Sequence, residues 1–142
     1  MLRLFFTMLL LLPMSAFAAK DDMAERVGRT FFEAILSGKV EIAMRLSAAK
    51  VNLDGHYFEK LEQIEIQFRR MSERAAALGL RLKSVRTLDR RQMFKRYGPG
   101  PKRIRPETKL KAQFVLARFN RKGAVAILEK QGLFWRVVAV TD

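Results

Sequence analysis

The one histidine of the chain, His56, is the side chain best suited to exchange protons near neutral pH. With Asp54 or Glu59 beside it, His56 could act as a general acid–base group. Alternatively, His56 lies in the exposed first turn of a helix, because Asp54 and Gly55 are typical of a helix start. We favour the second interpretation and assign no catalytic residue.

Other patterns of catalysis or metal binding are not found in the sequence. There is no cysteine, which excludes disulfides, zinc–thiolate sites, iron–sulfur clusters and thiol nucleophiles. Gly98-Pro99-Gly100 lacks the following lysine and serine or threonine of a phosphate-binding P-loop. We therefore expect no metal site and no cofactor, although carboxylates alone could hold a hard cation.

The first 18 residues have the three parts of a secretory signal peptide. Arg3 gives a positive start, an apolar run follows from Leu4 to Leu12, and Ala16-Phe17-Ala18 forms a small-x-small cleavage pattern. The alternative is an uncleaved anchor or a core helix, but the run is shorter than the roughly 20 residues of a membrane-spanning helix. We predict a single mature domain, residues 19–142, that is periplasmic or secreted. Without a cysteine it is not a lipoprotein.

Positive charge is concentrated in the second half of the chain. Residues 19–73 carry nine Lys/Arg and ten Asp/Glu, whereas residues 74–142 carry eighteen and four. The densest segment runs from Arg81 to Lys111, where only Asp89 and Glu107 are acidic. Such clustering favours an anionic partner; alternatively, the charge only keeps the protein soluble.

Part of this charge lies on a segment that Pro99, Pro101 and Pro106 are expected to stiffen. Because arginine and lysine bind phosphate and carboxylate groups, we predict a strand-and-loop surface for an anionic envelope surface or an acidic protein. Export argues against nucleic acid as the partner. The residues that we assign to this surface are Arg90, Arg91, Lys95, Arg96, Lys102, Arg103 and Arg105.

Apolar periodicity predicts three helices before any long strand. The first covers residues 24–36 and the second residues 40–48. The third starts at Asp54 or Gly55 and carries an apolar stripe as far as Leu78. This stripe could form a coiled-coil seam, but we expect it to pack against the protein's own sheet.

Alternating residues and turn signals predict four strands after the helices. They cover residues 80–97, 108–119, 124–130 and 133–140. The predicted fold class is α+β, with helices packed on one face of a curved, antiparallel four-stranded sheet. A long helix beside such a sheet leaves a concave pocket between the two layers.

Two segments carry a family resemblance: Phe31–Ile35 before Ser37-Gly38-Lys39, and the closing Gly132–Val138. With the order of elements, they resemble the NTF2-like superfamily, in particular its small exported members. The resemblance implies an NTF2-like or cystatin-like cone and a possible homodimer through the sheet. It leaves activity open, because the superfamily includes enzymes and non-catalytic modules. The expected pocket lining is Phe31, Tyr57, Phe68, Phe114 and Trp135.

Three functions are compatible with these observations. We favour an exported, non-enzymatic binding module that uses the basic surface. An alternative is a small-molecule-binding or isomerase-like enzyme with polar side chains that converge in the cone pocket. A third is a structural subunit of an envelope assembly, for which a large exposed apolar patch would be the sign.

Overall fold

The computed structural model of the chain describes residues 18–142, so residues 1–17 of the predicted signal peptide lie outside the described residues. The fold is α+β, as predicted. In chain order the elements are α1 (Ala18–Leu36), α2 (Val40–Arg45), β1 (Ser47–Leu53), β2 (His56–Phe58), α3 (Leu61–Ala77), β3 (Leu82–Asp89), α4 (Arg90–Tyr97), the 3₁₀ helix η1 (Lys102–Glu107), β4 (Gln113–Phe119), β5 (Gly123–Gln131) and β6 (Phe134–Thr141).

The sheet is mixed and has six strands, not the four antiparallel strands that we predicted. Its order is β2-β1-β6-β5-β4-β3, and β1 runs parallel to β6 whereas the other neighbours are antiparallel. The predicted meander is therefore present as β3–β6, and the β1–β2 hairpin extends it. Asp54 and Gly55, a turn or helix-cap signal in the sequence, form the turn of this hairpin with φ angles of 52° and 93°, and the third helix does not follow them directly.

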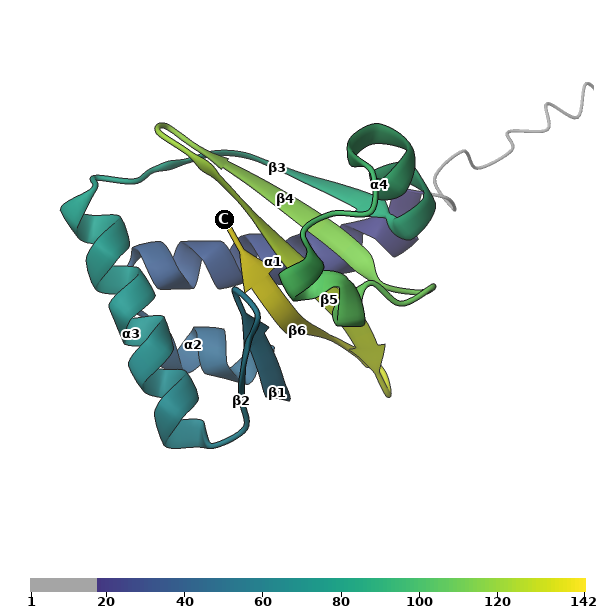
Figure 1. Cartoon of the computed structure of the whole chain (residues 1–142). Helices are drawn as coiled ribbons and strands as arrows, with labels where there is room; N and C mark the ends of the chain where they lie inside the picture. Colours follow the sequence, from purple (N-terminus) through teal and green to yellow (C-terminus); the bar gives the residue numbers. More distant parts are fainter. Residues whose placement is uncertain (1–17) are drawn as a thin grey trace, which may run out of the picture.

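The helices α1, α2 and α3 cover one face of the sheet (Figure 1). Phe31 of α1 and Phe68 of α3 are fully buried and meet edge-on, with ring centroids 5.4 Å apart. Gly28 lets α1 approach β4 closely, because a Cβ atom there would lie 2.5 Å from Cγ1 of Val115. The interface between these three helices and the sheet contains most of the large, fully buried side chains.

The opposite face of the sheet is covered by α4 and η1, so that α1 lies behind the sheet and η1 in front of it in Figure 1. Met93 of α4 and Ile104 of η1 are buried there against a second apolar cluster that includes Phe114 and Ile127. The sheet is thus buried on both faces in its middle. All buried apolar residues of the described part lie between Ala24 and Val140.

Several predicted boundaries were wrong; the strand expected from residue 108, for example, begins at Gln113. The third helix begins at Leu61, because the residues before it pair as the β1–β2 hairpin. The strand expected over residues 80–97 ends at Asp89, whose side chain starts α4 instead. The second helix ends at Arg45 rather than residue 48, since β1 begins at Ser47. Within residues 18–142, no helix is long and apolar enough to cross a membrane.

Candidate functional site

The basic segment that we predicted as strand and loop is a strand followed by two helices. Asp89 starts α4 through a capping box: its carboxylate accepts the Gln92 backbone N–H at 2.7 Å, and the Gln92 side chain accepts the Asp89 N–H at 2.9 Å. These two bonds satisfy backbone donors that a helix start would otherwise leave unpaired. Asp89 therefore has a structural task at the base of α4.

A buried amide fixes the second helix of the segment, η1, against the sheet. Asn52 on β1 is fully buried, and its Nδ2 donates to the backbone oxygen of Arg103 at 2.9 Å and to Oε2 of Glu107 at 2.8 Å. Its Oδ1 accepts the N–H of Gly55 at 2.7 Å. One side chain thus joins the β1–β2 turn to both ends of η1.

Tyr57 completes this junction from β2, where its hydroxyl donates to Oε1 of Glu107 at 2.6 Å. The hydrogen bond to the Glu107 carboxylate, together with partial burial, raises the pKa of Tyr57 above its usual value of 10.0. Glu107 therefore receives bonds on both carboxylate oxygens. Both acidic residues of the segment, Asp89 and Glu107, are engaged within the protein.

Six of the seven predicted anion-binding residues are exposed on α4 and η1. Five of these six have no carboxylate partner in an ion pair among residues 23–142, and we call this set the cationic face. It consists of Arg91, Lys95, Arg96, Lys102 and Arg105. Arg105 also donates from Nε to the oxygen of Gly100 at 3.2 Å. Arg90 is half-buried, with its guanidinium 4.7 Å from the ring centroid of Phe94.

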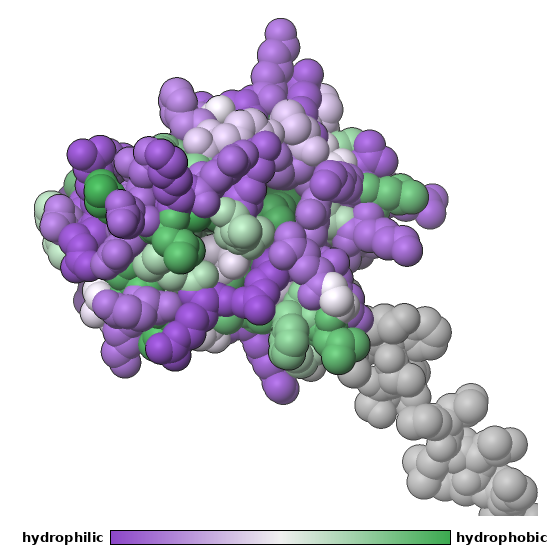
Figure 2. All heavy atoms as spheres, turned by 90° about the horizontal axis from the view of Figure 1, so that it is seen from below, coloured by the Kyte–Doolittle hydropathy of each residue, from purple (hydrophilic) through white to green (hydrophobic). Residues whose placement is uncertain are grey.

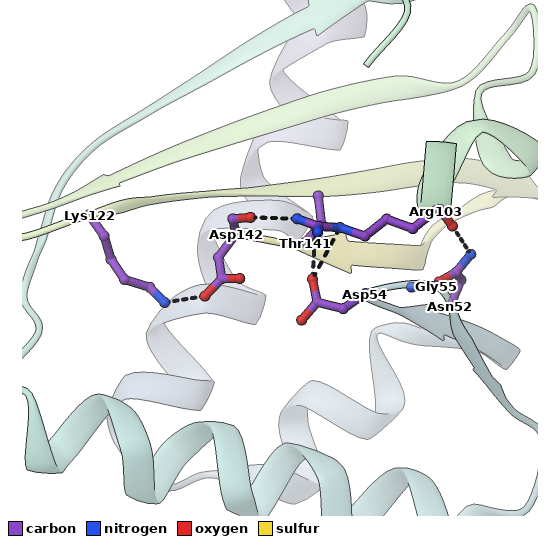
Figure 3. A network of polar contacts seen from close by, with 7 residues as sticks. All are labelled: Asn52, Asp54, Gly55, Arg103, Lys122, Thr141 and Asp142. Atoms are coloured by element: carbon purple, nitrogen blue, oxygen red, sulfur yellow. Dashed lines mark hydrogen bonds and ion pairs between the residues drawn. The ribbon is translucent and has the colours of Figure 1, made fainter. Parts of the chain in front are cut away.

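Arg103, the seventh residue, is exposed but takes part in a network of contacts with the end of β6 and the β1–β2 turn (Figure 3). Its Nε donates to Oγ1 of Thr141 at 3.0 Å, and its Nη2 donates to the backbone oxygen of Asp142 at 3.0 Å. Thr141 in turn donates to Oδ1 of Asp54 at 2.7 Å, and Arg103 lies 3.9 Å from the same oxygen. Arg103 therefore ties η1 to the end of β6, and is less available to a partner than the cationic face.

A cavity of about 290 Å³ lies between α1, α3 and the concave side of the sheet, near the β1–β2 and β4–β5 turns. Its apolar lining includes Phe32, Ile35, Met71, Leu80, Phe119 and Val140. The five aromatic residues that we predicted do not line it. Phe31 and Phe68 fill the core, Phe114 is buried on the opposite face, Trp135 packs against the first core cluster, and Tyr57 binds Glu107.

Charged and polar side chains gather around this cavity. Arg70 and Arg74 of α3 line it together with Lys122 and Asp142, which form an ion pair with each other (Figure 3). The hydrogen bond from Lys122 lowers the pKa of Asp142 below its usual value of 3.8. This contact therefore stabilises the fold above that value and is lost as the pH falls through the lowered pKa.

His56 also borders the cavity, and so does Asp54, the partner that an acid–base pair would use. His56 is exposed on β2 rather than in a helix. Among the side chains that the structure describes, those of residues 23–142, no group of three or more histidine, aspartate or glutamate residues is placed to hold a metal ion. The cavity therefore offers an apolar interior with a charged border, which suits a small amphipathic molecule.

No protein-family model matches the chain, and no curated protein matches its sequence.

Replacing Asn52 by leucine should destabilise the protein by about 2–4 kcal/mol, because it leaves several buried polar groups without partners. Urea unfolding followed by far-UV circular dichroism would measure the change. The control is Gln63→Leu, the same kind of change at an exposed position of α3. Equal stabilities of the two variants would show that the Asn52 amide does not hold η1.

The phenol of Tyr57 should titrate above pH 10.0, which absorbance of the phenolate can follow. Because the folded pKa is raised, the contact stabilises the fold at neutral pH and is lost as the pH rises through that pKa. Glu107→Gln should lower the pKa of Tyr57 toward the usual value. A Tyr97→Phe background removes the only other tyrosine. An unchanged titration in Glu107→Gln would contradict the assigned cause.

Proposed function

We propose that this chain is an exported, non-enzymatic binding module of NTF2-like fold whose cationic face binds an anionic surface or an acidic partner. The observation that carries the proposal is that the five side chains of this face are exposed, while Asp89 and Glu107 are engaged internally. The segment from Arg81 to Lys111 stays strongly positive because its twelve arginines and lysines far outnumber these two carboxylates.

The rigidity of the segment supports the same proposal. Both helices are attached to the sheet, α4 through Met93 and the capping box, and η1 through Ile104 and Asn52. Side chains on anchored helices lose less freedom on binding than side chains on a flexible loop. A cationic surface held in this way is suited to repeated, reversible contact with phosphate or carboxylate groups.

The NTF2-like assignment is supported by three features of the chain: a long first helix packed on the sheet, a β3–β6 meander, and a cavity between helices and sheet. Export is supported by the pattern of residues 1–18. On this proposal the anionic partner belongs to the cell envelope or the cell exterior. If two copies of the chain form a dimer through their sheets, they would have to meet on the sheet face opposite α1–α3, where α4 and η1 do not cover it.

The proposal is tested by removing three positive charges from the cationic face and comparing the result with a control variant that loses three positive charges elsewhere. Arg91, Lys95 and Lys102 are changed to Gln together; the control changes Arg26, Lys39 and Lys60, exposed cations of the helical layer. If each cation contributes about 1 kcal/mol, the first variant should bind dextran sulfate about 100-fold more weakly at low salt.

Titration of a fluorescent dextran sulfate at about 50 and 300 mM salt measures both variants, since exposed charges are screened over about a Debye length. Binding should weaken at the higher salt. Equal losses in the two triple variants would show that total charge, not the cationic face, determines binding. That result would overturn the proposal.

A second candidate function is the binding of a small anionic amphiphile in the cavity. The observation that favours it is the convergence of Arg70 and Arg74 beside an apolar interior. Lys122 is already paired with Asp142, whereas among residues 23–142 no carboxylate lies within 4.0 Å of the guanidinium groups of Arg70 and Arg74, although Arg74 is near enough to attract Asp142. An acyl chain could fill the apolar part while its carboxylate meets these guanidinium groups.

Calorimetric titration with decanoate tests this candidate. Arg74→Gln should weaken binding about tenfold, because it removes a charge-assisted contact to the carboxylate. Arg69→Gln is the matched control, since Arg69 lies on the same helix but outside the cavity. No heat of binding by the unaltered protein would exclude decanoate-like ligands.

A further inference from the structure

Three large apolar side chains project into solvent from two loops. Leu133 and Phe134 at the β5–β6 turn are 85% and 64% exposed, and Leu110 in the loop before β4 is 78% exposed. Isolated exposed apolar residues are common on protein surfaces. Here they occur as a set on neighbouring loops, and we call Leu110, Leu133 and Phe134 the apolar tip.

Strand register places both loops at the same end of the sheet. β4 begins at Gln113, which pairs with Leu128 near the end of β5, and β5 pairs with β6 up to Gln131 and Phe134. Lys109 also lies 3.3 Å from Glu129, which joins the first loop directly to β5. The two loops that carry the apolar tip therefore lie at the same end of the sheet, and one ion pair links the first of them to β5.

Cations surround the apolar tip. Lys109 and Lys111 flank Leu110, and Lys130 and Arg136 flank the β5–β6 turn. Glu129 is paired with Lys109, and the guanidinium of Arg136 lies 5.6 Å from the ring centroid of Phe134. In the view from below, hydrophilic side chains frame the small apolar patches of the surface (Figure 2).

α4 starts at the same end of the sheet, because β3 ends at Asp89, which pairs with Gln113. In Figure 1, α4 lies at the upper right and the β5–β6 turn at the lower right, so both are at the right-hand end of the sheet but are separated across its width. A surface that meets the apolar tip can therefore also attract the cations of α4. This juxtaposition joins apolar and electrostatic attraction at one end of the protein.

We infer that the apolar tip inserts into the interface of a lipid bilayer that contains anionic phospholipids. The inference rests on the proposed function, because it makes the anionic partner a membrane surface. Apolar side chains gain free energy on leaving water, and nearby cations are attracted to anionic headgroups. A bilayer accepts a few protruding side chains without a complementary shape, whereas a stable protein interface usually needs more than about 1,000 Å².

The sheet gives the tip a firm base. Leu128 and Val137 pair with each other and are fully buried in the core, and three further residue pairs continue the hairpin from there to the turn. Gly132 provides the left-handed backbone of the turn, with φ of 62°. Leu133 and Phe134 are thus held outward on a paired hairpin, and insertion requires no rearrangement of the fold.

The test uses the chain from Ala19 onward, which contains all the buried core residues of the described part. Co-sedimentation compares vesicles of phosphatidylcholine alone with vesicles that contain phosphatidylglycerol as well. The unaltered protein should bind the anionic vesicles. A Leu133→Ser/Phe134→Ser variant should bind them about 100-fold more weakly, or about tenfold for each side chain that no longer leaves water.

The matched control is Leu61→Ser/Ile66→Ser, which removes two exposed apolar side chains of α3 (69% and 49% exposed). It should bind anionic vesicles like the unaltered protein. Dextran sulfate binding should be the same for the tip variant and the unaltered protein, since that polymer has no apolar interior. Circular dichroism verifies that both double variants are folded.

A second measurement does not depend on any variant. Trp135, the only tryptophan, is next to Phe134, so phospholipids brominated near the headgroup should quench its fluorescence. No quenching, or equal vesicle binding by the tip variant and the control, would overturn the inference. If vesicles do not bind but dextran sulfate binding still depends on the cationic face, the inference fails and the proposed function stands. If neither binds, both fail.

Discussion

The buried amide of Asn52 is the contact on which the second face of the sheet depends. A buried amide is costly unless its donors and acceptor are paired, and Asn52 pairs them with η1 and the β1–β2 turn. This requirement fixes η1 over β6 and allows Ile104 to close the second apolar cluster. The chain between α4 and η1 is short, so the same contact limits where the cations of both helices can lie.

The fold also separates the acidic from the basic side chains of the second half. Asp89 caps α4, Glu107 receives Asn52 and Tyr57, and Asp142 pairs with Lys122. Glu129, the fourth acid, pairs with Lys109. Each acid therefore contacts another part of the protein. The charge surplus in the sequence becomes a surface property because residues 74–142 carry eighteen arginines and lysines against four acids, and most of these cations are exposed.

Much of this fold could be predicted, where the pattern of residues is regular. The stripe through Phe31 identifies α1, and alternation identifies β4, β5 and β6. Ser47–Leu53 does not alternate, and an Asp-Gly pair is as typical of a hairpin turn as of a helix start, so β1 and β2 were missed. The spacing of Asp89 and Gln92 is a visible capping-box signal for α4. Periodicity shows which residues face inward, but it cannot separate those that fill the core, such as Phe68, from those that border a cavity.

The apolar tip and the cavity lie at opposite ends of the sheet, and this arrangement allows both to bind their ligands at the same time. The β5–β6 turn forms one end, whereas Val125 pairs with Thr141 at the other, beside the β4–β5 turn and the Lys122–Asp142 ion pair. A protein docked through the apolar tip would therefore keep the charged border of its cavity away from the membrane. Because the intervening strands are paired and buried, docking would orient the cavity without changing its shape. A ligand could then enter or leave from the aqueous side while the cations of α4 stay close to the headgroups.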